Sequence, residues 1–403
     1  MIKKKCLVNI HLIVKIMKIA VLLPIEDNEL RIIEEYDRVG IVTDKPSFFL
    51  TSLILEMMRY GYNVCVISMS ANGDYTYIGE KLEIRIINIR KHGNLRALLK
   101  FKREINDISK ALEKSNCDLF HVHWCYEYAA AALSVCEKKT IITMHDWPES
   151  IREYLHNFYW RRRLSLGMKN VMRGNRFVAV SPYIKEQLDS IGKKSIIIPN
   201  YIDKSMIIDD RTEYNFLEPR IVNISNGFDD RKNTKSCIRM FSIFRRSFQK
   251  ATLVMIGDSY GPGEAAEQWS IENGISEGII FKGRVSSEDV YYELSRSEVM
   301  ISTSREESFG MTLIEAMASR CLAVGGKASG AVPWVLDGGR AGLLVDIDKP
   351  DEMARDIIEV LRDRQRYMTY IEYGSAYVFS NFTLDAVLDK YNKVYIAENA
   401  LIS

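Results

Sequence analysis

Two kinds of segment alternate in the hydrophobic pattern of this chain. Short, nearly continuous apolar runs rich in β-branched residues are separated by longer stretches with helical spacing. Strands buried on both faces have such continuous apolar runs, so the alternation predicts parallel sheets covered by helices. The predicted strands are Lys18–Leu23, Asn63–Ser68, Ile84–Ile89, Asp118–His123, Lys139–Met144, Arg176–Ser181, Ser195–Pro199, Arg220–Ser225, Ala251–Gly257, Gly278–Phe281, Glu298–Ser302 and Cys321–Gly325.

The helices between these strands are indicated by apolar residues that recur every three or four positions. One such face lies between Leu50 and Met58, and another lies between Leu384 and Tyr395. The strands form two series, which predict two doubly wound α/β domains with a ligand cleft at the carboxyl ends of the strands. The segment 199–203, Pro-Asn-Tyr-Ile-Asp, separates the series, so we expect an N-terminal domain at 1–200 and a C-terminal domain at 201–376.

Composition is that of an ordinary soluble globular protein. Apolar residues make up 47% and charged residues 27% of the 403 positions, enough for two hydrophobic cores. The net charge of +2 conceals an asymmetry, because residues 1–200 carry 31 Lys and Arg against 22 Asp and Glu, whereas residues 201–403 carry 24 against 31. The basic half could therefore face an anionic partner or a membrane surface.

Cysteine usage and the N-terminus indicate the compartment. The seven Cys form no CxxC pair, which favours free thiols in a reducing environment over a zinc site. The start, MIKKKCLVNIHLIVKIM, has an interrupted apolar part and no small-residue cleavage site, and no run in the chain reaches the roughly 18 apolar residues of a membrane span. We expect a cytoplasmic protein, and favour Met17 as the natural start over an amphipathic membrane anchor at residues 1–16.

The stretch at residues 305–320, REESFGMTLIEAMASR, combines a charged turn with a predicted helix from Phe309 to Ser319. The backbone N–H groups of its first turn would have no acceptor within the helix, and with the helix dipole they favour an anion such as phosphate. Glu307 precedes this turn and Glu315 lies inside the helix. Carboxylates on both sides of a phosphate site suit a nucleotide-diphosphate sugar, which carries ribose at one end and a hexose at the other.

This stretch resembles the E-x7-E signature of the retaining GT-B glycosyltransferases of family 4. The matching residues are Glu307-Ser308-Phe309-Gly310-Met311 and Glu315-Ala316-Met317-Ala318. The resemblance implies that Glu315 holds the ribose, that Glu307 holds the donor sugar near its C3 and C4 hydroxyls, and that the intervening residues also bind the donor. It further implies two Rossmann-like domains facing a central cleft, with the last helix, in 377–403, crossing back to the first domain.

A second motif resembles the family's diphosphate-binding loop. Gly227 matches the family's glycine and Lys232 its lysine, whereas Phe228 stands where an arginine is usual. Arg231 is the candidate to replace that arginine. Two cations facing a leaving diphosphate could each stabilise the transition state by about 2–4 kcal/mol. The alternative is that Asp229–Lys232 is an ordinary charged surface loop.

Two further segments of the second half match the donor side of the family. Gly257 ends a strand in the family's Val-Gly-Asp-Gly pattern, and Arg284 and Val285 match a segment that contacts the nucleotide base. Each could equally be a plain strand-to-helix turn. Near Gly325–Pro333 the chain departs from the family, because Trp334 replaces the usual glutamate.

Histidines at strand ends mark the first half. His145 and Asp146 match the family's His-Asp pair beneath the donor sugar, where a neutral imidazole could hydrogen-bond a donor hydroxyl. His123 is a further candidate on the acceptor side, and His121 is more readily explained as a core residue. These histidines could gather a metal, but no carboxylate or cysteine lies at ligand spacing, so we expect a metal-independent enzyme without a cofactor.

The acceptor side is less well marked. Lys45 lies in the long loop from Pro24 to Pro46, which replaces the family's Gly-Gly loop and would be either an acceptor-binding flap or an insertion. The basic, aromatic segment Tyr159–Leu164 would dock on anionic lipid headgroups or be a solvated helix face. No nucleic-acid-binding module accompanies the charge.

The sequence also lacks a G-x-G-x-x-G after a strand and a Walker loop, which argues against dehydrogenases and NTPases. We therefore expect a retaining hexosyltransferase that uses a UDP- or GDP-linked sugar. Its acceptor would be lipid-linked or a growing surface glycan, as in O-antigen, capsule or exopolysaccharide synthesis, with peripheral contact at the inner face of the cytoplasmic membrane. The alternatives are another GT-B reaction, such as a nucleotide-sugar epimerase or a phosphorylase, and a non-catalytic partner subunit.

Overall fold

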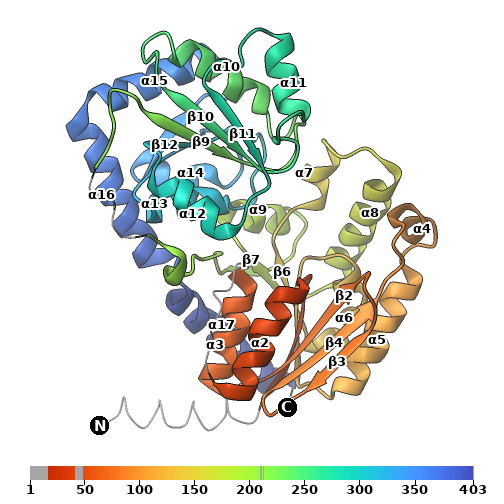
Figure 1. The fold of residues 1–403 in the computed structure, drawn as a ribbon. Helices are drawn as coiled ribbons and strands as arrows, with labels where there is room; N and C mark the ends of the chain where they lie inside the picture. The colour runs from red at the N-terminus through yellow and green to blue at the C-terminus, as the bar shows by residue number, and fades with distance from the viewer. Residues whose placement is uncertain (1–16, 41–48, 209–210, 212, 403) are drawn as a thin grey trace, which may run out of the picture. The chain divides into compact units, whose positions relative to one another are not determined.

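A computed structural model describes residues 17–40, 49–208, 211 and 213–402 of the chain. These residues form two compact units (Figure 1): the described residues up to 199 together with those from 384 onwards make the first, and those between 200 and 383 make the second. Residues 377–383 were expected to pack back on the first domain together with the rest of 377–403. They belong to the second unit, because helix α16 continues without a break to Asn381. Lys45 and residues 1–16 lie outside the described residues. The expected long loop from Pro24 to Pro46 is wrong over most of its length, because Asp27–Val39 forms helix α2.

The first unit is built on an eight-stranded sheet in the order β3-β4-β2-β1-β5-β6-β7-β8. All neighbouring strands are parallel except β3, which pairs with β4 in the antiparallel sense. The central strands are buried along nearly their whole length, as their apolar sequences require. The strands are β1 (Lys18–Leu22), β2 (Asn63–Ser70), β3 (Tyr75–Ile78), β4 (Leu82–Asn88), β5 (Leu119–His123), β6 (Thr140–Met144), β7 (Phe177–Ala179) and β8 (Ser195–Ile197).

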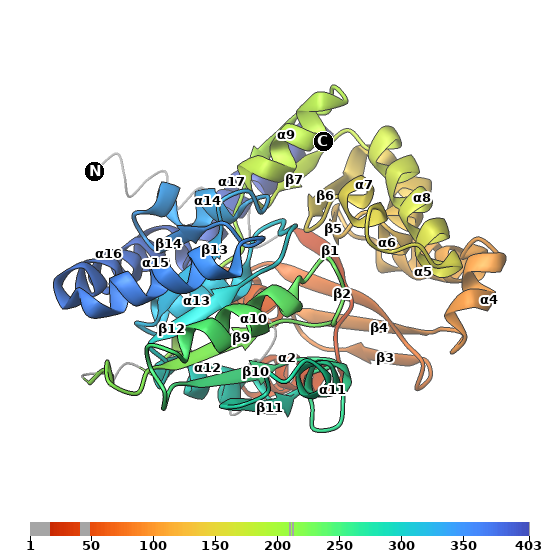
Figure 2. The same ribbon diagram turned by 90° about the horizontal axis from the view of Figure 1, so that it is seen from above.

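Helices connect these strands, and the C-terminal helix completes the same unit (Figures 1 and 2). Tyr391 and Tyr395 of that helix lie in the core of the first unit, where the Tyr395 hydroxyl is 2.7 Å from Nδ1 of His121. The helices are α2 (Asp27–Val39), α3 (Phe49–Tyr60), α4 (Gly93–Leu98), α5 (Lys102–Ser115), α6 (Glu127–Cys136), α7 (Pro148–Arg152), α8 (Phe158–Arg173), α9 (Pro182–Ser190) and α17 (Leu384–Ile402), with the 3-10 turn η1 (Glu137–Lys139).

The second unit contains a six-stranded, all-parallel sheet in the order β11-β10-β9-β12-β13-β14. Its strands are β9 (Arg220–Ile224), β10 (Thr252–Ile256), β11 (Ile279–Gly283), β12 (Val299–Ser302), β13 (Leu322–Gly326) and β14 (Leu343–Val345). Its helices are η2 (Lys204–Met206), α10 (Thr234–Phe244), α11 (Ala265–Glu272), α12 (Ser287–Ser295), α13 (Met311–Ala318), α14 (Val332–Val335), η3 (Asp337–Gly339), α15 (Pro350–Arg362) and α16 (Arg364–Asn381).

Helix α15 illustrates how sequence spacing builds this core. Its proline occupies the first helical turn, where a missing N–H costs nothing. Its buried residues recur at helical spacing and join the hydrophobic core cluster that also contains Phe241 and Phe244 of α10. They are Met353, Ala354, Ile357, Val360 and Leu361.

The twelve predicted strands are all present, and the expected doubly wound architecture is confirmed in both units. Two strands were missed. Strand β3 lies at the sheet edge with largely exposed side chains, so it has no buried apolar run to reveal it. Strand β14 is a run of three apolar residues bounded directly by Gly342 and Asp346, so the surrounding sequence resembles a loop.

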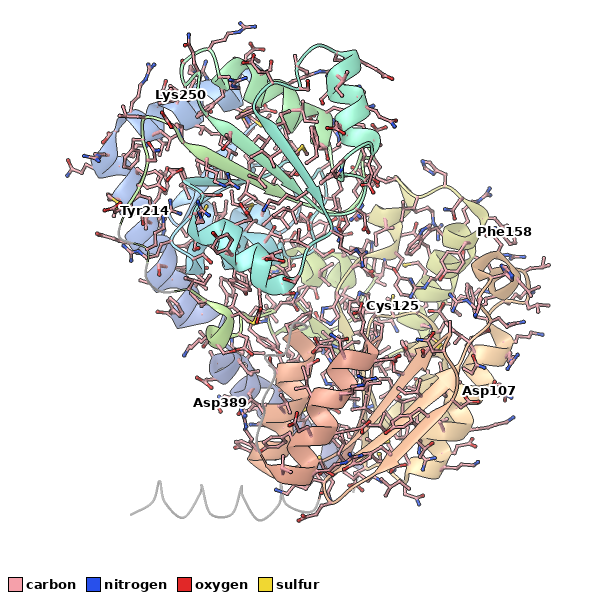
Figure 3. All side chains as sticks on the ribbon, in the orientation of Figure 1. Asp107, Cys125, Phe158, Tyr214, Lys250 and Asp389 are labelled. Carbon is pink, nitrogen blue, oxygen red and sulfur yellow. The ribbon has the colours of Figure 1, made fainter. Side chains whose placement is uncertain are left out.

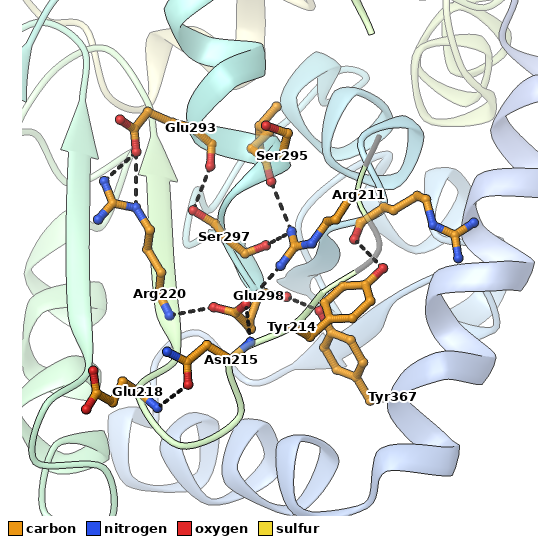
Figure 4. A network of polar contacts seen from close by, with 12 residues as sticks. Arg211, Tyr214, Asn215, Glu218, Arg220, Glu293, Ser295, Ser297, Glu298 and Tyr367 are labelled. Atoms are coloured by element: carbon orange, nitrogen blue, oxygen red, sulfur yellow. Dashed lines mark hydrogen bonds and ion pairs between the residues drawn. The ribbon is translucent and has the colours of Figure 1, made fainter. Parts of the chain in front are cut away.

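A polar network joins the amino ends of β9 and β12 in the second unit (Figure 4). Glu298 is 4% exposed and accepts a 2.9 Å bond from the guanidinium of Arg211, which is also 4% exposed. The same carboxylate accepts the backbone N–H groups of Asn215 and Arg220, at 3.0 and 2.7 Å. The network holds this end of the sheet together and leaves the carboxyl ends of the strands for other contacts.

Candidate functional site

The candidate donor-binding residues of the second unit lie on loops at the carboxyl ends of its strands. Four of these strands, β10, β9, β12 and β13, are neighbours in the sheet. The loop that follows β9 carries Gly227 and Lys232. The loop after β10 carries Gly257, and the loop after β12 carries Glu307. Because the carboxyl ends of parallel strands share one edge, residues up to 80 positions apart are brought to one face of the unit.

Lys232 and Glu307 form the centre of this face. The Lys232 ammonium nitrogen lies 2.7 Å from Glu307 Oε1, and the two side chains are only 12% and 20% exposed. Main-chain contacts hold the two loops in register, since Arg305 N–H donates to the Arg231 carbonyl at 2.8 Å and Thr303 Oγ1 donates to the Lys232 carbonyl at 3.1 Å. The sequence predicted both residues for the site, and the structure pairs them directly.

The loop after β13 supports Glu307 from the other side. The N–H of Ala331 donates to the Glu307 carbonyl at 2.8 Å. Gly330 has a φ of +56°, and a Cβ atom there would lie 2.4 Å from the same carbonyl oxygen. A side chain at position 330 would thus displace Glu307, so the glycine is required by a close backbone approach.

The two glutamates of the E-x7-E pattern have different electrostatic surroundings. Burial alone would raise the pKa of Glu307, but the charge and hydrogen bond of Lys232, with a bond from Ser304, bring its pKa below the usual value of 4.5. Burial raises the pKa of Glu315 to about 7, and no opposing charge offsets it. Glu307 is therefore an anion at neutral pH, whereas Glu315 is near its titration midpoint.

The helix that carries Glu315 begins two residues later than expected. Gly310 has a φ of +99° and forms the N-cap, so α13 starts at Met311 instead of Phe309. A left-handed backbone cannot continue into a right-handed helix, which accounts for the difference. By helix geometry the amides of Met311 and Thr312 have no intrahelical acceptor.

Ser308 and Phe309 precede this helix and are buried. The Ser308 hydroxyl donates to Glu306 at 3.2 Å. The Phe309 ring is 3% exposed and makes edge contacts with Trp334 and Phe382 at ring-centre distances of 6.1 and 5.6 Å. Phe309 can thus contribute only its backbone to a ligand, and Trp334, which departs from the family pattern, fills the same aromatic cluster.

Arg231 and Phe228 show how the diphosphate loop differs from the family. The Phe228 ring packs against Trp269, at a ring-centre distance of 6.0 Å, and lies against the hydrophobic core. Arg231 lies 3.9 Å from the buried Glu306 and also lowers the pKa of Glu307 through its charge. Its Nε is buried and has no hydrogen-bond partner among the described residues. Arg231 therefore places a second positive charge beside Lys232.

The glycines of the neighbouring loops allow close backbone packing. Gly257 has a φ of +129°, and a Cβ there would lie 1.8 Å from the Ser225 carbonyl oxygen. Gly227 donates its N–H to the Asp258 carbonyl at 3.1 Å. Arg284 makes a two-pronged ion pair with Asp258, at 2.9 and 2.8 Å, and its side chain is 72% exposed. Val285 follows on the same loop and is half-buried.

A separate cluster of histidines lies in the first unit, at the carboxyl ends of β5 and β6. His123 Nδ1 is 2.9 Å from His145 Nε2. His121 uses both ring nitrogens, with Thr143 Oγ1 at 2.8 Å and the Tyr395 hydroxyl at 2.7 Å. Burial lowers the pKa of His121 to about 3 and that of His123 well below 6.5, so both rings are neutral.

Two residues of this cluster were not singled out from the sequence. Trp124 has a φ of +67° and packs at a tilt against His145, with ring centres 4.4 Å apart. Tyr126 donates its hydroxyl to Asp146 at 3.0 Å. Trp124 directly follows the His-Val-His strand end, and a bulky residue in the left-handed region often marks a functional site, but a dihedral angle is not visible in the sequence.

Two kinds of feature are absent from the part of the chain that the structure describes. Those residues contain no group of three or more His, Cys, Asp and Glu side chains placed to hold a metal ion. Among the same residues, no helix combines the length and apolar character needed to cross a membrane.

Comparison with known families identifies both halves of the chain. Residues 207–377 match the model for glycosyl transferases group 1, and residues 48–205 match the model for glycosyltransferase family 4. A relative, N-acetyl-alpha-D-glucosaminyl L-malate synthase of Bacillus anthracis, is 23% identical over 304 residues, which is 72% of this chain and 77% of the relative.

Solved structures agree on the fold. Sucrose-phosphate synthase from Thermosynechococcus elongatus superposes with a TM-score of 0.72 at 16% identity, over 96% of this chain and 100% of the other. Anabaena HepE in complex with UDP and glucose gives a TM-score of 0.64 at 14% identity, over 94% and 99% of the two chains.

Proposed function

The chain is a GT-B glycosyltransferase of the group 1, family 4 kind, and on that premise we propose that it is a retaining hexosyltransferase. Its donor is a UDP- or GDP-linked sugar, and its acceptor is a hydroxyl of a lipid-linked or growing surface glycan. The enzyme works without a metal and acts at the inner face of the cytoplasmic membrane. The complex of HepE with UDP and glucose supports a nucleotide-sugar donor.

One observation carries the proposal: the Lys232–Glu307 pair lies directly before the helix that bears Glu315. Each part of a nucleotide-diphosphate sugar has a partner among these groups. Its diphosphate binds Lys232 and the amides at the start of α13, where the helix dipole favours negative charge. Its ribose hydroxyls donate to Glu315, and its sugar hydroxyls donate to Glu307.

The ion pair then changes partners when the donor binds. In the absence of donor, Glu307 neutralises Lys232 at 2.7 Å. The diphosphate replaces Glu307 as the counter-ion of Lys232, and the released carboxylate accepts hydrogen bonds from the sugar. Lys232 thus keeps an anionic partner before and after binding, and Glu307 exchanges its ion pair for hydrogen bonds, so neither partly buried charge is left without a polar partner.

The proposed chemistry is a front-face displacement. The bond between the anomeric carbon and the diphosphate oxygen breaks, and its electron pair remains on the diphosphate. The acceptor oxygen forms the new bond on the same face, and its proton passes to the departing phosphate oxygen. Lys232 and Arg231 stabilise the negative charge that develops on the leaving group, each by about 2–4 kcal/mol.

Binding and transfer can be tested separately. Thermal shifts with UDP, GDP, ADP and CMP sugars should identify one nucleotide that raises Tm. Lys232→Met should remove that shift and lower transfer at least a hundredfold, which corresponds to about 3 kcal/mol. The control is Lys235→Met, an exposed lysine of α10 whose ammonium lies over the Phe228 and Trp269 rings, which should leave both signals unchanged.

The same assay separates the alternative functions. Conversion of the donor without an acceptor would indicate an epimerase, and turnover that needs inorganic phosphate would indicate a phosphorylase. No conversion of any donor with any acceptor, together with no Tm shift, would indicate a non-catalytic subunit. L-malate belongs among the acceptors tried, because it appears in the name of the Bacillus anthracis relative.

The membrane part of the proposal rests on α4 and the start of α8, which pack together in the first unit (Figures 1 and 2). Arg96 of α4 donates to the Tyr159 hydroxyl at 3.0 Å, so the two helices are held together. Leucines 95, 98 and 99 of the α4 region remain 42%, 60% and 46% exposed, and Phe158 at the start of α8 is 45% exposed (Figure 3).

Positive charge surrounds these exposed apolar side chains. No Asp or Glu occurs from Arg90 to Arg103 or from Asn157 to Arg173, whereas both segments are rich in Lys and Arg. Apolar side chains inside a cationic border fit an anionic lipid surface, where each cation contributes about 1 kcal/mol. We therefore assign this surface, rather than the basic residues of α8 alone, to membrane contact.

Vesicle flotation tests this assignment. The protein should float with phosphatidylcholine vesicles that contain phosphatidylglycerol, and much less with phosphatidylcholine alone or at high salt. Replacing Leu95, Leu98 and Leu99 together by Ser should abolish flotation without changing Tm. Leu217→Ser is the matched control, because that side chain is 85% exposed but lies in the second unit. Flotation of the triple variant at the wild-type level would refute the assignment.

A further inference from the structure

His123, beside His145, has no role in the proposed chemistry, although its side chain is buried and contacts His145. His123 is fully buried, and its Nδ1 lies 2.9 Å from His145 Nε2. Its other nitrogen, Nε2, is buried and has no hydrogen-bond partner within the described part of the chain. We propose that His123 is a positioning residue that donates Nδ1–H to His145 and so fixes His145 as the tautomer protonated at Nδ1.

The argument begins with the number of protons on His123. Burial and the neighbouring histidines hold its pKa far below neutrality, so the ring carries a single proton. That proton is either on Nδ1, where it bonds His145, or on Nε2, where no acceptor is found. The 2.9 Å contact requires one donor and one acceptor, so the two rings must hold their protons in a linked arrangement.

The two proton arrangements differ in whether His123 Nε2 is an unpaired acceptor or an unpaired donor. With the proton on Nδ1, His123 donates to His145 and leaves a bare lone pair at Nε2. With the proton on Nε2, His145 donates to His123 and leaves a buried N–H without an acceptor. Buried N–H groups without a partner are rarer in proteins than under-satisfied acceptors, so the first arrangement is favoured.

The neighbouring aromatic rings do not provide a hydrogen-bond partner for His123 Nε2. The neighbouring His121 ring, 4.3 Å away between centres, already uses both nitrogens, on Thr143 and Tyr395. Trp124 packs on the His145 ring at 4.4 Å and restricts its rotation. Tyr395 of the C-terminal helix thus occupies His121 Nδ1, and neither His121 nitrogen is left to pair with His123 Nε2.

The consequence concerns the role of His145, and this step rests on the proposed function. An imidazole whose Nε2 accepts from His123 is neutral and carries its only N–H at Nδ1. Toward a donor sugar, such a ring can donate a hydrogen bond but cannot act as a base through Nε2. His145 therefore stabilises an oxygen of the substrate and does not remove its proton.

Nitrogen-15 NMR decides the tautomers without any assay of activity. The full-length protein, labelled in its six histidines, should show both His123 and His145 as neutral rings protonated at Nδ1 in long-range proton–nitrogen spectra. Signals are assigned from single substitutions. A His145 ring protonated at Nε2, or a His123 ring protonated at Nε2, would overturn the proposal whatever the enzyme's function proves to be.

A matched pair of variants then tests positioning. In His123→Asn the amide nitrogen takes the place of Nδ1 and can still donate, whereas His123→Leu has the same shape and no donor. The Asn variant should keep the His145 tautomer and most of kcat. The Leu variant should give mixed His145 tautomers and a kcat lower by about tenfold, the value of one buried hydrogen bond, with little change in the donor KM.

Tyr391→Phe is the control for a neighbouring polar change, because it removes the 3.3 Å contact with Thr143 and leaves the His123–His145 bond in place. It should change neither tautomer nor kcat. Equal tautomers and equal kcat in the Asn and Leu variants would exclude positioning by His123. If the Leu variant fails to fold, the wild-type spectrum still decides the proton arrangement.

Discussion

Single residues show how the candidate site departs from the family pattern. Phe228 stands where an arginine is usual, and it packs on Trp269 beside the core, so it adds no charge. Arg231, three positions later, lies close enough to Glu307 to lower its pKa. The positive charge beside Lys232 is thus supplied from another position of the same loop.

Glu315 provides a prediction about pH. Its pKa is raised to about 7 by burial, so it is mostly protonated at pH 6 and mostly ionised at pH 8. Ribose hydroxyls bond an ionised carboxylate more strongly, so donor affinity should rise by up to about tenfold between these values. Calorimetric titration of the wild type and Glu315→Gln at both pH values provides the measurement, and the Gln variant should show no such rise.

The same residue links pH to stability, with a defined sign. The folded-state pKa of Glu315 lies above its usual value of 4.5, so the folded protein binds this proton more tightly. Its contribution to the free energy of unfolding is full below about pH 4.5 and falls by about 1–3 kcal/mol as the pH rises through 7. Urea unfolding should show this fall in the wild type relative to Glu315→Gln. A constant difference between the two proteins from pH 5 to pH 8 would contradict the assignment.

At the scale of elements, the start of α13 depends on one backbone conformation. Gly310 has a φ of +99° and ends the turn that carries Glu307, so the helix amides begin where a diphosphate would bind. The turn and the helix thereby act as one element: the turn presents a carboxylate, and the helix presents N–H groups and Glu315. A shift of the helix start would separate these groups.

Gly310→Ala tests this element. An alanine at this φ is strained, and its Cβ would lie 2.9 Å from Cδ1 of Leu313, so the free energy of unfolding should fall by about 1–2 kcal/mol. Gly192→Ala is the control, since Gly192 has a φ of +74° and nothing lies within 4 Å of a Cβ there. Both variants should lose stability in urea unfolding, Gly310→Ala more because of its clash with Leu313, but only Gly310→Ala should also lose donor affinity.

At the scale of the whole molecule, the chain forms two units that depend on different polar contacts. The first unit is completed by the last helix, where Tyr395 bonds the buried His121 at 2.7 Å. The second unit is one continuous stretch, and Glu298 with Arg211 holds the end of its sheet opposite the candidate donor-binding residues. The contacts that stabilise the second sheet therefore lie at the amino ends of its strands, whereas the candidate donor-binding residues lie at the carboxyl ends.

Two substitutions should separate the units in calorimetry. Tyr395→Phe leaves His121 Nδ1 without its partner and should destabilise the first unit by about 1–3 kcal/mol. Glu298→Gln leaves the buried Arg211 without a counter-charge and should destabilise the second unit by about 3–5 kcal/mol. Neither should change the affinity of the folded protein for the donor. A loss of donor affinity in Glu298→Gln would show that the two ends of the sheet are coupled.

The sequence by itself determined most of the strands and the choice of candidate site residues. Continuous apolar runs predicted twelve strands, because a strand buried on both faces needs apolar residues at consecutive positions. The E-x7-E stretch indicated a phosphate site with two flanking carboxylates. It did not reveal β3, whose side chains are exposed, or the start of α13, which a single dihedral angle at Gly310 sets.

Only the tertiary structure decided which residues meet. Lys232 and Glu307 are 75 positions apart, and they form a pair because β9 and β12 are neighbours in the sheet. His123 and His145 meet because β5 and β6 are neighbours, and Tyr395 reaches His121 because the last helix packs on the first unit. Side-chain periodicity is a local property of the backbone, whereas strand order and helix packing are set by burial across the whole unit, so contacts between distant residues cannot be deduced from spacing alone.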